Sequence, residues 1–452
     1  MTSAVVIGLA RTGVAMARAL ADEGYAVRVV DSADDDTVRN RAAELPRGVG
    51  VELGGYPVDV ASGAALVSPS PGVRWDAPEL EWARAHGIPV RSEMDLVFER
   101  FHGPIVGVTG TNGKTTTTAL VAAILERDER RVLLGGNIGT PVIDKLHATH
   151  DDEWLVLELS SFQLETVEQP RCSIACVLNV TPDHLDRHGA FEVYAGIKER
   201  IVRHARDDVV LGYDDPVTRL MAHSASARLR FFGAALTDQE GVTLRDADIV
   251  SIEAGRAMPV LPVSSIPLFG THNVFNVMAA VAMARAASVE PATIAAAVRD
   301  FRAVPHRLEI VLERDGVVWI NDSKATNPDS AIVGVRAFSG RPLVWIGGGR
   351  SGGAPAGALA DEVAAHARAV VLNGESARDL DAALEQRGFS ERVVVPTLDH
   401  AVQRAHDLAR AGDIVLFSPG FKSFDQFHDF EARGDRFREL VQAIAADTVS
   451  AG

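Results

Sequence analysis

The chain has 452 residues, 47% of them hydrophobic and 23% charged, and its formal net charge is −16. This length is too great for one ordinary core and favours three domains, while the composition is that of a globular protein. The negative charge argues against a nucleic-acid partner, and no segment has the features of a signal peptide or a membrane span. We therefore expect no membrane partner, a cytoplasmic location and, by default, a monomer.

The first 101 residues have the outline of a dinucleotide-type half-fold. A strand at residues 4–7 enters a glycine turn, a helix runs to residue 22, and a second strand ends at Asp31. Ala10 replaces the middle glycine of the usual pattern, which favours a nucleoside-diphosphate site over a nicotinamide site. A strand near residues 66–69 leads into a loop with Ser70 and Gly72, which is equally consistent with a ligand loop and a plain turn. Residues 88–93 are predicted to form a last short strand.

A variant phosphate-binding loop opens the second domain, predicted at residues 102–304. An apolar strand at residues 105–109 is followed by a glycine loop, and a helix begins with Lys114 and Thr115. Backbone N–H groups of such a loop face an anion, the lysine adds a positive charge, and the threonine hydroxyl suits Mg²⁺. Val108 stands where the strict pattern has glycine, and the alternative is a strand-to-helix turn that merely uses glycines. The pattern predicts a bound nucleoside triphosphate.

Polar side chains follow later strands of this domain. Asn137 lies in a glycine loop, and Glu158 ends a buried strand, where a Mg²⁺ ligand is expected, the alternative being a capping or salt-bridge acid. His184 follows another strand and is a candidate for a second metal position. Zinc is disfavoured because no spaced set of Cys and His ligands is present. Lys198, on a helix predicted at residues 191–205, is interpreted from the sequence alone as an exposed lysine.

Residues 305–452 predict a further doubly wound, mostly parallel sheet. Its strands are expected at residues 317–320, 343–346, 369–372, 393–395 and 414–417. Polar loops follow three of them, at residues 321–328, 347–351 and 418–425. Three α/β domains with ligand-like loops at their strand ends suggest a reaction that joins several substrates.

Six motifs occur in an order that resembles one family, the Mur ligases of peptidoglycan synthesis. They lie at residues 110–115, 158–163, 179–186, 270–273, 306–307 and 321–327. Within the family, the run at residues 158–165 and the closing segment at 418–427 are most similar to the branch that adds D-glutamate. The resemblance implies three domains: a Rossmann-like UDP-binding domain (1–101), a central ATP-binding domain (102–304), and a C-terminal domain (305–452) that binds the amino acid and closes over ATP.

The resemblance also implies the chemistry and the partners. ATP phosphorylates the carboxylate of UDP-N-acetylmuramoyl-L-alanine, the amine of D-glutamate attacks the acyl phosphate, and phosphate leaves from a tetrahedral intermediate. The implied cofactors are ATP and Mg²⁺ at two sites, with Lys198 as a carbamate. The implied catalytic residues are Lys114, Lys198, His184 and Glu158, and the implied metal ligands are Thr115, Glu158, His184 and Lys198.

Two sets of binding residues follow from the same resemblance. ATP is expected to contact Gly110, Thr111, Asn112, Gly113, Lys114, Thr115, Thr116, Asn273, His306, Arg307 and Asp322. The two substrates are expected to contact Thr12, Asp31, Ser32, Ser70, Gly72, Asn137, Lys324, Thr326, Ser423 and Phe430.

The chain departs from the family pattern in the amino-acid pocket. Related enzymes have a lysine after the glycine loop of the third domain, where this chain has Arg350 and Ser351. Phe421 and Lys422 stand where small residues are usual, and Lys422 is a candidate for the displaced positive charge. The alternatives that stay open are another amino-acid ligase of the superfamily, including a folylpolyglutamate type, a phosphate-loop switch, and a nicotinamide oxidoreductase.

Overall fold

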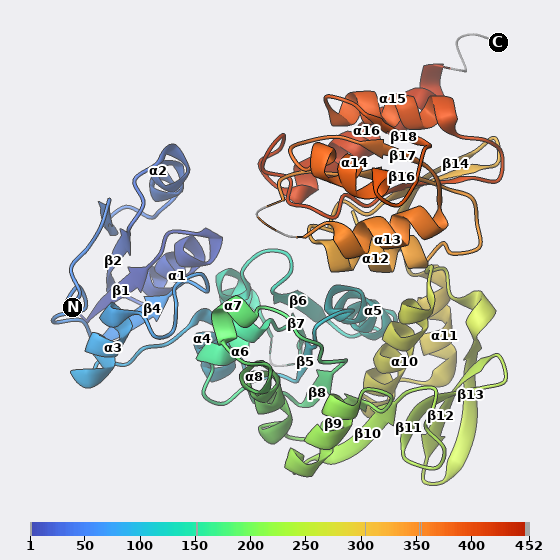
Figure 1. The fold of residues 1–452 in the computed structure, drawn as a ribbon. Coiled ribbons are helices and arrows are strands. Elements are labelled where there is room, and N and C mark those ends of the chain that lie inside the picture. The colour runs from blue at the N-terminus through green and yellow to red at the C-terminus, as the bar shows by residue number, and fades with distance from the viewer. Residues whose placement is uncertain (1, 151, 303, 352, 354, 448–452) are drawn as a thin grey trace. The chain divides into compact units, whose positions relative to one another are not determined.

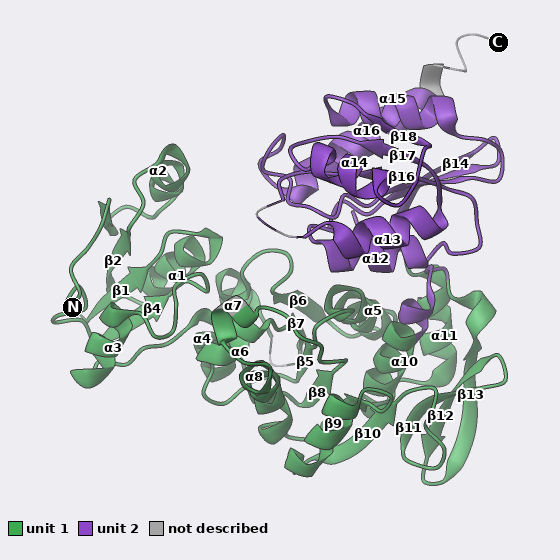
Figure 2. Cartoon of the chain, in the orientation of Figure 1, with its two compact units in different colours: residues 1–266, 275–301 green, residues 267–274, 302–452 purple. Residues whose placement is uncertain are grey.

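The computed structural model of the chain describes residues 2–150, 152–302, 304–351, 353 and 355–447, and Figure 1 shows an α/β fold with three sheets. The chain packs into two compact units (Figure 2). Unit 1 contains residues 1–266 and 275–301 and holds two sheets. Unit 2 contains residues 267–274 and 302–452 and holds the third. The predicted α/β class with three mostly parallel sheets is confirmed; the exact domain boundaries remain predictions.

The N-terminal sheet is parallel, with the strand order β3-β2-β1-β4. Chain order runs outward from β1 to β3 and then returns to the other side of β1 with β4. The carboxyl ends of β1 and β4 are therefore a topological switch point, where open α/β sheets bind ligands. The strands are β1 (Ser3–Ile7), β2 (Ala26–Asp31), β3 (Gly50–Leu53) and β4 (Leu66–Pro69), and the helices are α1 (Arg11–Asp22), α2 (Asp36–Ala43), α3 (Pro78–Ala85) and α4 (Glu93–Arg100).

The short strand predicted at residues 88–93 is wrong. The structure has only an isolated parallel bridge between Val67 and Val90 there. Pro89 has no N–H group to extend a ladder, and Ser92 already caps α4 through a reciprocal capping box with Asp95.

The central sheet has nine strands in the order β13-β12-β11-β10-β9-β8-β5-β7-β6. It is parallel except for the antiparallel pairs β11–β12 and β12–β13 at one edge. Every residue of β5 is buried, as expected for a strand covered on both faces. Since β5 lies between β7 and β8, the loops that follow these three strands emerge side by side.

The strands of this sheet are β5 (Ile105–Thr109), β6 (Val132–Gly136), β7 (Trp154–Glu158), β8 (Ile174–Val177), β9 (Asp208–Gly212), β10 (Arg228–Phe232), β11 (Gly241–Arg245), β12 (Asp248–Glu253) and β13 (Arg256–Pro262). The α-helices are α5 (Lys114–Arg127), α6 (Ser161–Thr166), α7 (Leu185–His188), α8 (Phe191–Arg203), α9 (Pro216–Leu220), α10 (Thr271–Ala286) and α11 (Pro291–Asp300). Three short 3-10 helices are η1 (Val142–Ala148), η2 (Met221–Ser224) and η3 (Val263–Ser265).

Unit 2 is built on a six-stranded sheet in the order β14-β15-β19-β16-β17-β18. Only β14, at one edge, is antiparallel to its neighbour. The strands are β14 (Glu309–Arg314), β15 (Val317–Asn321), β16 (Leu343–Gly347), β17 (Ala367–Leu372), β18 (Arg392–Val394) and β19 (Ile414–Phe417), and the helices are α12 (Pro328–Arg336), α13 (Gly357–His366), α14 (Ala377–Glu385), α15 (Leu398–Leu408) and α16 (Phe430–Asp447). The five predicted strands of this sheet are confirmed to within two residues, and β14 was not predicted.

Two further features concern partners and reactivity. None of the helices in the described part of the chain is long and apolar enough to cross a membrane. Cys172 and Cys176 are free thiols with no exposed surface, and burial raises the pKa of each.

Candidate active site

The predicted phosphate-binding loop follows β5, the third strand from one edge of the nine-stranded sheet. It connects β5 to α5, and Gly113, the residue before α5, has a left-handed backbone with φ of 83°. A β-carbon at Gly113 would clash with the Oδ1 atom of Asn276. Glycine is therefore required here both for the backbone conformation and for the close approach of α10. Thr115 and Thr116 are buried in the first turn of α5.

Two lysines lie against this loop. The Nζ atom of Lys114 donates to the carbonyl oxygens of Gly110 and Thr111, at 2.9 and 2.7 Å. Nζ of Lys198 donates to the same Gly110 oxygen at 2.8 Å, and Lys198 is only 1% exposed. Burial and the positive charge of Lys114 hold the pKa of Lys198 well below its usual range. The interpretation of Lys198 as an exposed lysine, drawn from the sequence alone, is therefore wrong.

Tyr194 connects the loop to Lys198. Its hydroxyl lies 3.1 Å from Oγ1 of Thr111, which also donates to the carbonyl of Thr181. Nζ of Lys198 lies 4.6 Å from the centre of the Tyr194 ring. Burial, the first cause, raises the pKa of Tyr194 to about 12, so the hydroxyl stays neutral. Sequence reasoning missed this residue, although its spacing of four from Lys198 on one helix places both on the same face.

A second residue to which the sequence assigned no role is Asn179, the first residue of the motif at 179–186, shortly after β8. Its Oδ1 accepts from the backbone N–H of Asn112 at 2.8 Å, and its Nδ2 donates to the carbonyl of Asn112 at 3.1 Å. The side chain thus pairs with the backbone of the phosphate loop in both directions. A polar residue two positions after a strand beside β5 was the available signal.

Glu158 ends β7 beside the loop and is 2% exposed. Its Oε1 accepts from Nδ2 of Asn137 at 2.9 Å, and the backbone N–H of Asn137 donates to the Glu158 carbonyl at 2.8 Å. Oε2 is buried without a hydrogen-bond partner in the described part of the chain. A buried carboxylate oxygen left unpaired is costly unless it binds a cation or a proton.

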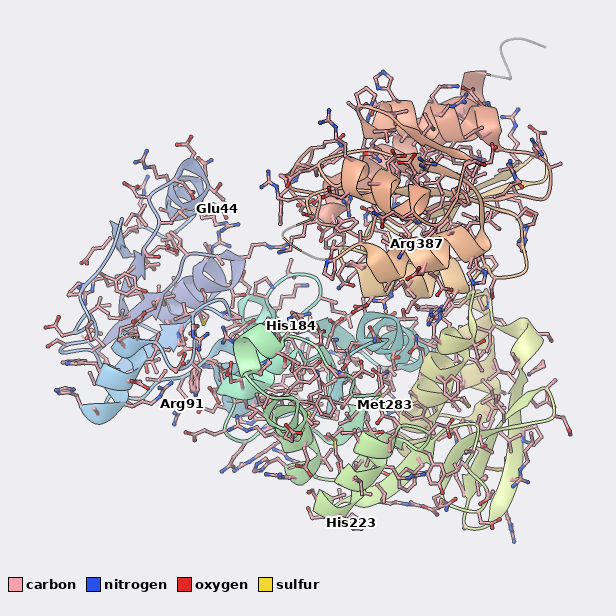
Figure 3. All side chains as sticks on the ribbon, in the orientation of Figure 1. Glu44, Arg91, His184, His223, Met283 and Arg387 are labelled. Carbon is pink, nitrogen blue, oxygen red and sulfur yellow. The ribbon has the colours of Figure 1, made fainter. Side chains whose placement is uncertain are left out.

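His184 has a different environment. His184, which Figure 3 labels, precedes α7 with a left-handed backbone (φ 51°). Its ring centre lies 4.8 Å from that of Phe162. Its Nε2 is 3.5 Å from Oδ2 of Asp183, and its side chain is 47% exposed. In the described ranges, no three His, Cys, Asp or Glu residues are already gathered around a metal position. The donors nonetheless suit Mg²⁺, because the orphaned Glu158 oxygen and the Thr115 hydroxyl are oxygen ligands.

The first predicted substrate residues converge at the switch point of the N-terminal sheet. Asp31 ends β2, and its two carboxylate oxygens accept from the backbone N–H groups of Leu9 and Ala33 at 2.7 and 2.9 Å. The hydroxyl of Ser70 donates to the carbonyl of Gly8 at 2.6 Å. Asp31 and Ser70 thus hold the glycine turn in place; Thr12 lies in the first turn of α1, Ser32 directly follows β2, and Gly72 is exposed in the loop after β4.

Several other predicted residues lie at the carboxyl edge of the unit 2 sheet. Oδ2 of Asp322 accepts from the Ser418 hydroxyl at 2.6 Å, and burial raises the pKa of Asp322 to about 7. The positive charge of Arg307 acts in the opposite direction on that carboxyl. His306 is buried with φ of 63°, and its Nδ1 accepts from Nδ2 of Asn321 at 3.1 Å. Asn321 belongs to the polar loop and the motif predicted at residues 321–327, but the sequence assigned it no role.

The residues expected to bind the amino acid lie near the same carboxyl edge of the unit 2 sheet. The Lys324 ammonium lies 5.6 Å from the centre of the Phe430 ring, and the backbone N–H of Thr326 donates to the Lys324 carbonyl. Ser423 is 2% exposed. Arg433, which sequence reasoning missed, donates to the Ser323 hydroxyl and carbonyl and to the Phe421 carbonyl, so it ties these loops together.

Two residues that depart from the family pattern in the predicted amino-acid pocket, Arg350 and Lys422, lie opposite each other. Arg350 and Lys422 form an isolated antiparallel bridge, with N–H donation from Arg350 to Lys422 at 2.8 Å and back at 3.2 Å. Nε of Arg350 is 3.3 Å from a carboxylate oxygen of Glu375, while Lys422 is exposed and has no ion-pair partner in the part of the chain that the structure describes.

Asn273 belongs to unit 2, whereas the loop after β5 belongs to unit 1. Its Nδ2 donates to the carbonyl of Phe269 at 2.7 Å, and the segment 267–274 packs with unit 2. The structure therefore groups the predicted residues into three sets: the switch point of the N-terminal sheet and the loop after β5 in unit 1, and the carboxyl edge of the sheet in unit 2.

Comparison with known proteins identifies the family. The sequence matches the domain families described as "Mur ligase MurD-like, N-terminal domain" over residues 2–92, "Mur ligase middle domain" over 108–284 and "Mur ligase, glutamate ligase domain" over 306–421. A protein of Gloeobacter violaceus named UDP-N-acetylmuramoylalanine--D-glutamate ligase is 43% identical over 453 residues, covering 99% of this chain and 100% of the relative. The chain belongs to the Mur ligase family.

Other Mur ligases support the same assignment. The Acidobacterium capsulatum protein of the same name is 42% identical over 444 residues, covering 97% of this chain and 96% of the relative. The solved structure of UDP-N-acetylmuramate-alanine ligase MurC from Thermotoga maritima shares the fold, with a TM-score of 0.62 at 21% identity and coverage of 98% and 100%. As a Mur ligase, the chain is an enzyme that joins small-molecule substrates in peptidoglycan synthesis, and this ATP-dependent family implies ATP and Mg²⁺ as cofactors.

Proposed function

We propose that the chain joins D-glutamate to UDP-N-acetylmuramoyl-L-alanine and converts one ATP to ADP and phosphate through an acyl phosphate. The observation that carries this proposal is the group of phosphate-loop lysines and buried carboxylate beside β5, combined with relatives of that name at 42 and 43% identity over nearly the full chain. The cytoplasm and a monomeric state belong to the same proposal.

The first half of the reaction activates a carboxylate. One oxygen of the alanyl carboxylate attacks the γ-phosphorus of ATP, and the bond to the β,γ-bridging oxygen breaks, which yields an acyl phosphate and ADP. Negative charge spreads over the transferred group, so positioning and neutralisation provide most of the catalysis. Lys114 and the loop N–H groups, from Gly110 to Thr116, would hold the β- and γ-phosphates.

The second half forms the amide. The neutral amine of D-glutamate attacks the acyl carbon, a tetrahedral intermediate forms, and phosphate leaves as the amine loses its proton. Asn137 would bind the first substrate, and its hydrogen bond to Glu158 supports this role. Lys324, Thr326, Ser423 and Phe430 would bind the amino acid at the carboxyl edge of the unit 2 sheet.

The metal positions are proposed from the donor set. Glu158 and Thr115 would hold one Mg²⁺, and His184 with a carbamate on Lys198 would hold the second. These ions would supply charge neutralisation at the phosphoryl oxygens. Asn273, His306, Arg307 and Asp322 would surround the rest of ATP.

The nucleotide part of the first substrate is proposed to lie at the N-terminal switch point. The N-cap of α1, Ala10, provides no side-chain acceptor, so the first N–H groups of α1 are available to a diphosphate. Thr12, Asp31, Ser32, Ser70 and Gly72 surround this position.

Phosphate release from ATP tests the proposed function. The purified protein is incubated with UDP-N-acetylmuramoyl-L-alanine and, in turn, D-glutamate, L-glutamate, D-aspartate, L-alanine and L-lysine. Phosphate release and a new amide product only with D-glutamate are expected. Product with another amino acid would replace D-glutamate in the proposal, and steady phosphate release without any amine acceptor would refute the ligase mechanism.

A further inference from the structure

The first turn of α16 contains an arginine, Arg433, that is buried without an ion-pair partner. Its exposed fraction is 4%, and no carboxylate oxygen of the described residues lies within 4.0 Å of its side-chain nitrogens. Burial lowers the pKa of Arg433 to about 10, so the guanidinium is still positively charged at neutral pH. An unpaired buried charge costs free energy, and so does a positive charge at a helix N-terminus. The stability of α16 therefore does not account for an arginine at this position.

The guanidinium instead connects two loops that follow strands of the unit 2 sheet. Its Nε donates to the Ser323 hydroxyl at 3.0 Å, and its Nη2 donates to the Ser323 carbonyl at 2.8 Å. Its Nη1 donates to the Phe421 carbonyl at 2.9 Å. Ser323 follows β15, and Phe421 follows β19. A planar group with donors in several fixed directions can hold both loops at once, which a lysine ammonium cannot do with the same geometry.

A third loop, the glycine loop after β16, approaches the same guanidinium. Gly349 in this loop has φ of 139°, and a β-carbon added there would lie 3.2 Å from Nη1 of Arg433 and would clash with the Lys422 carbonyl. Glycine is therefore needed for this close approach. Since β19 lies between β15 and β16, the loops after three adjacent strands meet at Arg433.

These loops contain residues that are expected to bind the amino acid. Lys324 directly follows Ser323, and Ser423 is two positions after Phe421. The Ser323 hydroxyl also donates to the carbonyl of Phe430 at 2.8 Å. One buried side chain is thus connected, through Ser323 and Phe421, to three of the four residues assigned to the amino acid.

The neighbouring residue assigned to ATP is held by other contacts. The backbone N–H of Asp322 donates to the Phe417 carbonyl at 2.7 Å, and its Oδ1 accepts from the N–H of Leu308 at 3.2 Å. Its Oδ2 accepts from the Ser418 hydroxyl. Loss of Arg433 should therefore disturb the amino-acid residues more than Asp322.

We propose that Arg433 is a positioning residue for the amino-acid substrate, because its guanidinium fixes the relative positions of the loops that contain Lys324, Ser423 and Phe430. It acts through these residues, since its own side chain is buried beneath their loops. This inference rests on the proposed function, which assigns the amino acid to this edge of the sheet.

Two variants and two controls test this inference. Arg433→Lys keeps the positive charge but loses the planar group, and Ser323→Ala removes only the hydroxyl between Arg433 and Phe430. Arg230→Lys is the control for a buried arginine, because the Arg230 side chain is 6% exposed and donates to Asp208 in unit 1, away from the unit 2 loops. Arg436→Lys is the control on α16 itself, where Arg436 pairs with Asp399 at the surface.

Initial rates of amide formation are measured with ATP, UDP-N-acetylmuramoyl-L-alanine and D-glutamate varied in turn, and thermal unfolding checks that each variant is folded. We expect Arg433→Lys to raise the KM for D-glutamate roughly tenfold and Ser323→Ala roughly threefold, with less than twofold change in the other two KM values. The increase in the double variant should be smaller than the product of the two single increases, because both substitutions remove the same hydrogen bond. Both controls should keep all three wild-type KM values, even where Arg230→Lys lowers the melting temperature.

An unchanged glutamate KM in folded Arg433→Lys, equal increases in all three KM values, or the same glutamate increase in Arg230→Lys would overturn the inference. Where Arg433→Lys does not fold, Ser323→Ala decides by the same comparison of KM values. Failure of the wild type to form an amide with D-glutamate would instead refute the proposed function.

Discussion

The ammonium nitrogen of Lys198 lies 2.8 Å from the carbonyl oxygen of Gly110, the first residue of the phosphate-binding loop. A lysine with almost no exposed surface, beside a second lysine, is held in its neutral form more readily than a surface lysine. A neutral amine is the form that adds carbon dioxide, with release of a proton, to give a carbamate. The environment of Lys198 therefore favours the carbamate proposed for it.

Lys198→Ala tests this role. We expect a loss of roughly 100-fold or more in kcat, because the substitution would remove the proposed ligand of the second Mg²⁺, and partial recovery with added formate or acetate. Steady-state phosphate release with and without the short carboxylates measures both effects. Lys145→Ala, at an exposed position of η1, is the control and should keep wild-type activity. A correctly folded Lys198→Ala protein that no carboxylate rescues would contradict the carbamate.

Gly113→Ala tests the geometry of the loop. The added methyl group would clash with the Asn276 side chain in a left-handed residue, so ATP binding should weaken by roughly 100-fold. Gly24→Ala is a matched control, because Gly24 has φ of 86° and no atom within 4 Å of the added methyl group. Both variants should lose about 1 kcal/mol of stability from the backbone alone. Nucleotide titration and thermal unfolding separate the two effects, and equal ATP affinities in the two variants would refute the prediction.

The sequence predicts those parts of the fold that depend on local patterns. The alternation of apolar strands, glycine turns and helices in residues 4–31 and 105–126 is sufficient to place β1, α1, β2, β5 and α5. The edge strands β13 and β14 were not predicted, because half-exposed antiparallel strands lack a continuous apolar run. Pro89 lies in an extended segment that pairs through one bridge only, which no local pattern distinguishes from a strand.

The residues of the candidate site also divide into those that local sequence predicts and those that depend on long-range contacts. Lys114 and Thr115, at the start of the helix after β5, and Glu158, at the end of β7, are candidates that the order of the elements along the chain predicts. The burial of Lys198 depends on packing of α8 against β8 and the loop, and Arg433 contacts Ser323 across 110 positions of sequence. Long-range contacts of this kind cannot be derived from spacing along one chain.

Glu93 makes the stability of the chain depend on pH. It is 3% exposed at the start of α4, where it accepts from the backbone N–H of Ile143 at 3.5 Å, and burial raises its pKa to about 7. The folded state thus binds a proton more tightly than the unfolded state, whose carboxyl titrates near 4.5. The contribution of Glu93 to stability is therefore full below about pH 4.5 and is lost as pH rises through about 7.

Glu93→Gln keeps the shape but cannot ionise. Relative to the wild type, its melting temperature should increase between pH 5 and pH 8. Over the same range, the unfolding free energy of the variant should rise relative to that of the wild type by an amount of the order of 2–3 kcal/mol. Thermal unfolding at half-unit pH intervals measures this, and Glu99→Gln, on the exposed face of the same helix, is the control. A pH-independent difference between Glu93→Gln and the wild type would show that Glu93 does not titrate in this range.

Lys422 and Arg350 are opposite each other on one backbone bridge, yet their charges differ in availability. The Arg350 guanidinium is close to Glu375, so part of its charge is compensated, whereas Lys422 has no ion-pair partner among the described residues. If Lys422 supplies the cation of the amino-acid pocket, Lys422→Ala should raise the KM for D-glutamate by about tenfold and change the KM for ATP less than twofold. Arg350→Ala, as the comparison on the same bridge, should raise the glutamate KM by less. An unchanged glutamate KM in Lys422→Ala, or a larger increase in Arg350→Ala, would assign the pocket to the guanidinium instead, despite its pairing with Glu375.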